Sequence, residues 1–312
     1  MFPHVVWTEW DDLTIPDGFK CLSPIPAPLD SADLGEITFY APPYMGSRDA
    51  LLPILRMPNL RIIQLPNAGY EDALEFMRPG VTLCNARGVH DASTSELAIG
   101  LTIAALRGFP FFLQNQFQGK WCHERRGSLI DGRVGIIGFG SIGQKIARNL
   151  SGFEVEVIGF SRSGSIGSKR MDELDVELPS LDVVILALPL NSESHGLFDA
   201  RRLALMKDGA LIVNVARGPI IDTASLLNEL NSGRILAALD VTDPEPLPPG
   251  HPLWSAKGVL IAPHVGGDSP AFEPRFRRLV EDQLRRLKVG AGLQNVIIDG
   301  NEKLELEVSS EN

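Results

Sequence analysis

The sequence predicts an α/β protein built from two doubly wound, parallel-sheet domains. Short apolar runs alternate with helical patterns along the 312-residue chain, as expected where helices cover parallel sheets. A chain of this length normally forms two domains with substantial cores. In its middle, the apolar run Val134–Ile137 leads straight into the glycine-rich turn Gly138-Phe-Gly140-Ser-Ile-Gly143 and then into a helical pattern. The order of strand, turn and helix fits this fold class.

Candidate strands fall into an early and a late group. In the early group, proline-rich connections such as Pro24–Pro28 and Ala41–Pro43 separate the apolar runs Val5–Trp7, Ile37–Tyr40, Leu60–Leu65 and Val81–Cys84. The late group comprises Val134–Ile137, Val155–Phe160, Val183–Leu188, Leu211–Val215, Leu236–Asp240 and Val259–Ile261. Each group is predicted to form its own sheet.

Two helical segments are expected to connect the groups. Ser93-Thr-Ser-Glu96 has the pattern of a capping box, with Ser93 as the cap, and predicts a helix to about Arg107. A second helix begins near Pro274 and carries an apolar stripe at helical spacing. This late helix would return the chain to the first sheet. We therefore expect a domain of residues 93–269 inserted into a discontinuous, flavodoxin-like domain of residues 1–92 and 270–312.

Composition and charge argue against several classes of function. The net charge of −10 argues against general affinity for nucleic acid or anionic membranes. The start, Met1-Phe-Pro-His-Val, lacks the pattern of a signal peptide, and no stretch is long enough to span a bilayer. Three widely spaced cysteines favour reduced thiols in a cytoplasm, and no Cys/His cluster has metal-ligand spacing. We expect a cytoplasmic protein without a metal.

The glycine-rich turn predicts a Rossmann-type dinucleotide site. Gly138 permits a tight turn, Gly140 lets the backbone approach a pyrophosphate, and Gly143 lets the helix pack closely on the strand. The first helical N–H groups, around Ser141 and Ile142, would point at the phosphates. The alternative is a glycine-rich turn in an ordinary α/β unit.

The end of the next strand indicates which dinucleotide binds. Sites for NAD usually place a carboxylate here to accept from the ribose 2′-OH. In this chain Val155–Phe160 is followed by Ser161-Arg162-Ser163, which offers a guanidinium and hydroxyl groups to a 2′-phosphate. The pattern favours NADP(H). A solvated basic loop that tolerates NAD(H) is the alternative.

Ionisable side chains follow successive late strands. Arg217 comes after Leu211–Val215, Glu245 lies beyond Leu236–Asp240, and His264 comes after Val259–Ile261. The carboxyl ends of parallel strands share one edge of the sheet, where ligands bind in this architecture. Each residue alone has an ordinary structural explanation. Together, downstream of a dinucleotide turn, they form a candidate catalytic set.

At these residues the chain resembles the D-isomer-specific 2-hydroxyacid dehydrogenase family. The resemblance spans essentially the whole chain, and Ser161-Arg162-Ser163 is most like NADPH-dependent glyoxylate/hydroxypyruvate reductases within it. The matching motifs are Asn67-Ala68-Gly69-Tyr70, Gly88-Val89-His90-Asp91, Thr94-Ser95-Glu96, Gly138–Gly143, Asn214-Val-Ala-Arg217-Gly218, Ala238-Leu-Asp240-Val, Asp243-Pro-Glu245-Pro and Pro263-His264-Val-Gly266. Asp268, after the last motif, departs from the short Ser/Ala/Thr run of many relatives and adds a carboxylate near the site.

The resemblance implies a role for each matching residue. Arg217 would bind the substrate carboxylate and polarise the keto oxygen, His264 would donate a proton to that oxygen, and Glu245 would hold the imidazole. Backbone N–H groups of Ala68 and Gly69 would hold the carboxylate as well. Asp240 would orient the nicotinamide amide. The cofactor groove would be lined by Thr94, Leu188, Pro189, Val215, Ala216 and Gly266.

These inferences lead to a reductase of small 2-oxo acids, such as glyoxylate or hydroxypyruvate, that uses NADPH. The alternatives are an NAD-dependent dehydrogenase of another D-2-hydroxy acid, such as 3-phosphoglycerate, and a dinucleotide-sensing, corepressor-like protein. The family also implies a homodimer, with an active site between the domains that closes over the substrate. The aromatic run Phe109–Trp121 is either core or subunit contact, and Tyr44, Met45 and Tyr70 either shape the substrate pocket or pack in a core.

Overall fold

The computed structural model describes residues 4–22, 31–46, 48–164 and 167–300. The chain divides into two compact units, one made of Met1–His90 with Pro270–Asn312 and the other of Asp91–Ser269. The predicted division at residues 92/93 and 269/270 lies within two residues of this one. The predicted connection Pro24–Pro28 falls outside the described residues.

The first unit is built on a six-stranded sheet with the order β13-β5-β4-β3-β1-β2. Its strands are parallel except β13, which runs antiparallel to β5 at one edge. They are β1 (Val5–Trp7), β2 (Lys20–Leu22), β3 (Phe39–Tyr40), β4 (Ile62–Gln64), β5 (Thr82–Cys84) and β13 (Val296–Ile298). The helices are α1 (Ser31–Glu36), η1 (Arg48–Ala50), η2 (Leu52–Arg56), η3 (Glu71–Phe76) and α8 (Phe272–Val289).

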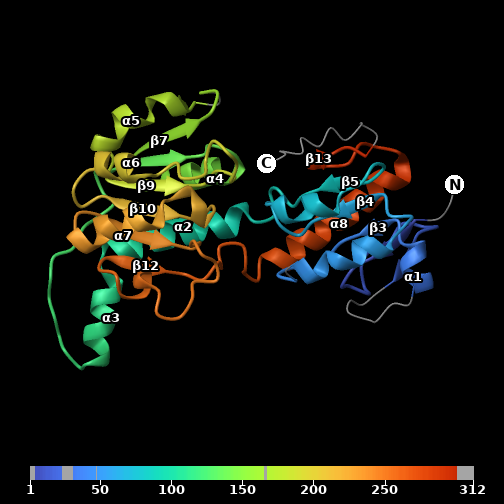
Figure 1. The fold of residues 1–312 in the computed structure, drawn as a ribbon, viewed down its shortest axis with the longest axis horizontal. Coiled ribbons are helices and arrows are strands. Elements are labelled where there is room, and N and C mark those ends of the chain that lie inside the picture. The colour runs from blue at the N-terminus through green and yellow to red at the C-terminus, as the bar shows by residue number, and fades with distance from the viewer. Residues whose placement is uncertain (1–3, 23–30, 47, 165–166, 301–312) are drawn as a thin grey trace, which may run out of the picture. The chain divides into compact units, whose positions relative to one another are not determined.

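The second unit contains a seven-stranded parallel sheet with the order β12-β11-β10-β9-β6-β7-β8. Figure 1 shows β7, β9, β10 and β12 stacked in this order. The strands are β6 (Arg133–Ile137), β7 (Glu156–Ser161), β8 (Lys169–Arg170), β9 (Val183–Leu186), β10 (Leu211–Asn214), β11 (Leu236–Leu239) and β12 (Val259–Ile261).

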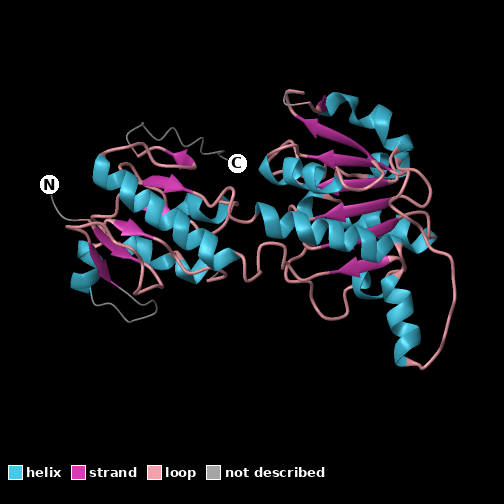
Figure 2. Cartoon of the chain, turned by 180° about the vertical axis from the view of Figure 1, so that it is seen from behind, coloured by secondary structure: helices cyan, strands magenta, loops and turns pink. Residues whose placement is uncertain are grey.

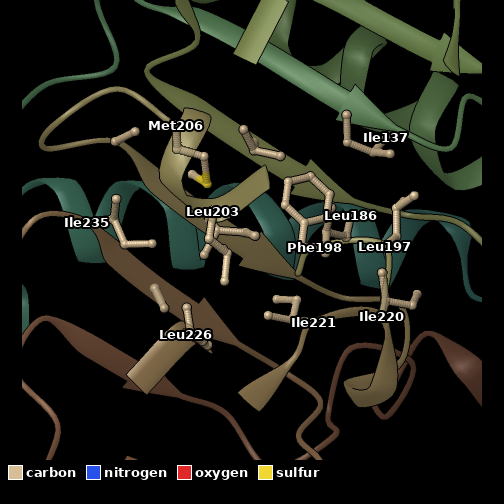
Figure 3. Packing of buried hydrophobic residues seen from close by; sticks show 14 of the residues in the cluster. Ile137, Leu186, Leu197, Phe198, Leu203, Met206, Ile220, Ile221, Leu226 and Ile235 are labelled. Carbon is tan, nitrogen blue, oxygen red and sulfur yellow. The ribbon is translucent and has the colours of Figure 1, made fainter. Parts of the chain in front are cut away.

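Helices flank this sheet, as Figure 2 shows from behind. They are α2 (Asp91–Leu106), α3 (Phe109–Phe117), α4 (Ser141–Leu150), η4 (Met171–Glu173), α5 (Leu174–Glu177), η5 (Leu178–Ser180), α6 (Ala200–Leu205), η6 (Gly218–Ile220), α7 (Thr223–Ser232) and η7 (Pro252–Ser255). Leu203 of α6 and Leu226 of α7 pack with Leu186 and Phe198 in one core (Figure 3). Helices α2 and α4 belong to a separate core with β6 and β10. Strands buried in this way read as continuous apolar runs, which is why the sequence marks them well.

The structure confirms the predicted fold class of parallel-sheet α/β domains, and it corrects several details. The capping-box prediction is wrong: α2 begins at Asp91, so Ser93 lies inside the first helical turn and cannot cap it. A carboxylate at the first helical position is itself favourable near the positive end of the helix dipole. The edge strands β2, β8 and β13 were not predicted. The two strands β2 and β8 contain charged residues and leave little apolar pattern, whereas β13 is a short apolar run that the prediction missed.

The aromatic run Phe109–Trp121 is not core. Its helix α3 buries none of its own residues within the described chain, and Phe117 and Trp121 are 85% and 99% exposed. The apolar residues Phe109 and Leu113 are half exposed. Among the described residues, no single helix is long and apolar enough to cross a membrane; only α2 and α3 taken together meet that length and composition, with a 65° bend between them.

Candidate active site

Arg217, Glu245 and His264 follow three neighbouring strands of the second unit. Arg217 comes after β10, Glu245 after β11 and His264 after β12, and β11 lies between the other two in the sheet. All three strands are parallel, so these residues share the carboxyl edge of the sheet. The structure therefore brings the predicted set to one edge.

His264 is held by backbone and side-chain bonds. Its N–H donates to the Asp240 carbonyl oxygen at 2.7 Å, and its backbone adopts the left-handed conformation with φ of 53°. Its Nδ1 makes a short hydrogen bond to Oε1 of Glu245. A non-glycine residue with positive φ is uncommon and is often found at functional sites. The Nδ1 contact leaves Nε2 as the ring nitrogen available to a substrate.

The pairing between these side chains sets their protonation. The hydrogen bond and charge of Glu245 raise the pKa of His264 above its ordinary value of 6.5, although burial acts against this. Burial alone would raise the pKa of Glu245, but its hydrogen bond and charge interaction with His264 outweigh burial and lower that pKa. The arrangement therefore favours an imidazolium paired with a carboxylate, which is a proton donor held in place.

Asp240 supports the loop that carries His264. Its buried carboxylate accepts from the Val265 N–H at 2.8 Å and from the Gly266 N–H at 3.0 Å. A Cβ on Gly266 would lie 2.7 Å from that carboxylate, so glycine allows this close approach. Burial raises the pKa of Asp240 even though both N–H groups stabilise the anion.

Arg217 sits on a turn fixed by Asn214. The Asn214 side-chain amide donates to the Arg217 carbonyl at 2.9 Å and its oxygen accepts from the Ala216 N–H at 3.0 Å. The next residue, Gly218, touches the neighbouring loop so closely that a Cβ would lie 1.9 Å from the Thr242 carbonyl oxygen. Thr242 also donates through its N–H to Glu245 at 3.4 Å. Asn214 and Thr242 are positioning residues that the sequence-based prediction did not include.

Each glycine of the predicted cofactor turn has a different environment. Gly138 has φ of 96°, and a Cβ there would lie 2.5 Å from the Ala187 carbonyl oxygen. A Cβ on Gly143 would lie 2.1 Å from the Gly138 carbonyl oxygen, so the start of α4 presses against the turn. A Cβ on Gly140 would meet nothing within 4 Å. Gly140 is the N-cap of α4 and, in the described chain, no side chain caps this helix. An exposed glycine beside uncapped N–H groups fits the close approach of a pyrophosphate.

The other predicted cofactor residues lie around this turn and the strands beside it. Leu188 and Pro189 follow β9, and Leu188 borders Gly138. Val215 and Ala216 follow β10 and are buried. Thr94, buried on α2, borders Gly266. Ser141 and Ile142 are the first residues of α4.

The end of β7 presents the predicted phosphate-recognition segment. The hydroxyl groups of Ser161 and Ser168 are 2.7 Å apart, and Ser161 also accepts from the Gly164 N–H at 3.1 Å. The Arg162 side chain is 76% exposed, and its Nη2 lies 2.9 Å from Oε2 of Glu193. Ser163 follows in the same loop. Glu193 is a partner that the sequence did not indicate, because the two residues are 31 positions apart.

The remaining predicted residues lie in the first unit. Ala68 and Gly69 follow β4, where the Ala68 carbonyl accepts from the Asn85 side chain at 2.6 Å. Tyr44 stacks on Phe272 with ring centroids 4.0 Å apart, which favours packing as its role. Met45 is exposed and Tyr70 is half-buried.

The chain matches a family model and is similar in sequence to glyoxylate reductases. The family model described as D-isomer specific 2-hydroxyacid dehydrogenase, NAD binding domain, matches residues 99–266. Glyoxylate reductase from Thermofilum pendens is 32% identical over 245 residues, which are 74% of this chain and 71% of that protein. Glyoxylate reductase from Thermococcus kodakarensis is 34% identical over 254 residues, which are 75% of each chain.

Solved structures agree with this result. A D-isomer specific 2-hydroxyacid dehydrogenase from Xanthobacter autotrophicus Py2, in complex with NADPH and MES, matches with a TM-score of 0.77 and 26% identity, covering 96% of this chain and 99% of that one. A D-isomer specific 2-hydroxyacid dehydrogenase family protein from Aeromonas salmonicida matches with a TM-score of 0.82 and 27% identity, covering 95% and 99%.

Proposed function

Because this chain belongs to the D-isomer specific 2-hydroxyacid dehydrogenase family and is an enzyme with a nicotinamide cofactor, we propose that it reduces a small 2-oxo acid with NADPH. The glyoxylate reductases among its relatives support glyoxylate or hydroxypyruvate as the substrate class. The observation that carries the proposal is the His264–Glu245 pair at the same sheet edge as Arg217. The product is the 2-hydroxy acid, which has the D configuration where the new hydroxyl-bearing carbon is chiral, as it is after reduction of hydroxypyruvate.

Each side chain of the set has a chemical task in this proposal. A nicotinamide cofactor, when bound, would supply the hydride that adds to the keto carbon. His264, protonated and oriented by Glu245, gives its Nε2 proton to the keto oxygen, so that the carbonyl becomes a hydroxyl group. Arg217 binds the carboxylate and polarises the carbonyl, because its guanidinium stays charged and offers paired donors. The backbone N–H groups of Ala68 and Gly69 contribute to carboxylate binding.

The cofactor assignment rests on two segments of the second unit. Residues 91–269 are proposed to bind the pyrophosphate at Gly140 and the start of α4, and the nicotinamide amide at Asp240. Arg162, with Ser161 and Ser163, is proposed to receive the 2′-phosphate, and these three residues include no carboxylate of the kind that binds the ribose 2′-OH of NAD. These features support NADPH as the preferred cofactor.

We also propose a homodimer in the cytoplasm. Phe109, Leu113 and Phe117 of α3 and the nearby Trp121 are exposed, and a second copy of this chain would cover them. The chain has three widely spaced cysteines, Cys21, Cys84 and Cys122, which supports a reducing compartment.

Initial rates test the proposal directly. Oxidation of NADPH and NADH is followed side by side with glyoxylate, hydroxypyruvate, pyruvate and a bulkier 2-oxo acid. We expect a clear NADPH preference with a small acid. Preference for NADH would contradict the assignment of Ser161–Ser163, and the absence of turnover with every acid would contradict the substrate class.

A further inference from the structure

An ion pair lies across the end of the strand that leads into the cofactor turn. Arg162 directly follows β7, and Glu193 lies in the loop after β9. Both strands are neighbours of β6 in the sheet order β9-β6-β7. The Arg162–Glu193 contact, with Nη2 and Oε2 2.9 Å apart, therefore bridges the carboxyl end of β6. The glycine-rich turn begins at that point.

The loop holds Glu193 in this position. The Asn191 side-chain oxygen accepts from the N–H groups of Glu193 at 2.9 Å and Ser194 at 3.0 Å. The Ser194 hydroxyl donates to the Pro189 carbonyl at 2.7 Å and accepts from the Asn191 N–H at 2.8 Å. These bonds close the turn on itself, so the backbone presents the Glu193 carboxylate toward Arg162.

The Glu193 carboxylate is paired with the Arg162 guanidinium, which the proposed function assigns to the 2′-phosphate. A phosphate group that binds Arg162 must displace Glu193 or share the guanidinium with it, and the two anions repel each other. NADH has a hydroxyl group at this position and does not need Arg162. Glu193 therefore disfavours the binding of NADPH and NADP⁺, which carry the 2′-phosphate, but not the binding of NADH.

We propose that Glu193 is a cofactor-specificity residue, which competes with the 2′-phosphate for Arg162 and lowers the affinity for NADPH and NADP⁺ without changing that for NADH. This inference rests on the proposed role of Arg162. The pair is solvent-exposed on both sides, so the size of the effect is modest. Exposed ion pairs of this kind correspond to changes of up to about fivefold in an equilibrium constant.

Binding calorimetry with the Glu193→Gln variant tests the proposal, because glutamine keeps the size of the side chain and removes its charge. We expect NADPH and NADP⁺ to bind about two- to fivefold more tightly than to the wild type, with the dissociation constant of NADH unchanged. Asp208→Asn is the matched control. Asp208 is 87% exposed and pairs with Arg234 at 3.4 Å, but it precedes β10 and so lies at the opposite edge of the sheet.

Other outcomes would overturn the proposal. Unchanged or weaker NADPH binding in Glu193→Gln, an equal gain for NADH, or the same gain in Asp208→Asn would each contradict competition at Arg162. The Arg162→Ala variant separates this failure from failure of the proposed function. If it weakens NADPH alone while Glu193→Gln has no effect, only the role of Glu193 is wrong; if it weakens both cofactors equally, the 2′-phosphate assignment is wrong as well.

Discussion

At the scale of single residues, the protonation of His264 depends on a partner from another loop. Glu245 raises the pKa of His264 above 6.5, so the imidazolium needed for proton donation persists to higher pH than in a solvated histidine. The rate of 2-oxo acid reduction is therefore retained below the raised pKa. It falls as the pH increases through that pKa.

Glu245→Gln should move this alkaline limb to lower pH. The amide removes the charge that stabilises the imidazolium, so His264 loses its proton earlier. The pH profile of kcat/KM in the direction of reduction measures the shift, with NADPH saturating. An alkaline limb that stays at the wild-type position would show that Glu245 does not set the protonation of His264.

Arg162→Ala should raise the KM for NADPH about 10- to 100-fold and change that for NADH little. A lost charge-assisted hydrogen bond costs about 1.5–3 kcal/mol, and only NADPH carries the 2′-phosphate. Steady-state kinetics with each cofactor measure the two values. Arg201→Ala removes another exposed arginine, paired with Asp175, and serves as the control. Equal changes for NADPH and NADH would contradict the assignment.

The strand that each candidate catalytic residue follows could be predicted from the sequence, because each of these strands is a clear apolar run. Their contacts could not be predicted in the same way. Asn214 and Thr242 bond residues two or three positions away, in turns whose conformation the apolar pattern does not give. Glu193 pairs with Arg162 of another loop, and that pairing depends on the order of strands in the sheet. An apolar pattern gives the position of a strand along the chain but not its neighbours.

At the scale of elements, two glycines of the glycine-rich turn are expected to serve different properties: Gly140 serves cofactor binding and Gly143 serves the stability of the fold. Gly140→Ala should leave the thermal stability unchanged, because a Cβ there meets nothing within 4 Å, yet should weaken NADPH about tenfold by filling the space in front of α4. Gly143→Ala should instead destabilise the protein by about 1–3 kcal/mol, because its Cβ would overlap the Gly138 carbonyl oxygen.

Thermal unfolding and NADPH titration of both variants provide the measurement. We expect the NADPH affinity to change in Gly140→Ala and the stability to change in Gly143→Ala. A marked loss of stability in Gly140→Ala, or unaltered NADPH affinity in that variant, would contradict the assignment of the open space to the pyrophosphate.

Interior elements were more predictable than edges. The bounds of the interior strand β1 match the prediction, and β9 and β10 lie within longer predicted runs. The edge strand β12 is an exception, because its three residues are all apolar and it was predicted with its observed bounds. Interior strands are covered on both faces and so are apolar throughout. The short edge strands and the first turn of α2 depend on tertiary contacts and local charge, which leave weaker signals in the sequence.

At the scale of the whole molecule, the exposed helix α3 bears on assembly. Phe117→Glu should convert the proposed dimer into a monomer, because it places a charge where an apolar contact would form. Val176→Glu, at another residue that is 80% exposed, should leave the oligomeric state unchanged. Sedimentation velocity distinguishes the two states. A wild-type monomer, or a Phe117→Glu dimer of wild-type stability, would contradict the proposed contact.

The insertion of one unit into the other was predicted from the apolar stripe of the late helix, and α8 does belong to the first unit. The subunit contact could not be predicted from the sequence in the same way. An aromatic run has the same composition in a core and at an interface, so Phe109–Trp121 left both alternatives open. The exposure of α3 removes the core alternative.

The central claim is that the site built around His264 transfers a proton during reduction and does not serve cofactor binding alone. Replacement of His264 by asparagine is the most direct test, with kcat measured by initial rates on glyoxylate or hydroxypyruvate and NADPH affinity measured by calorimetry. We expect a loss of about 10²- to 10⁴-fold in kcat with nearly unchanged NADPH affinity. Equal loss of both, or unchanged turnover, would contradict it.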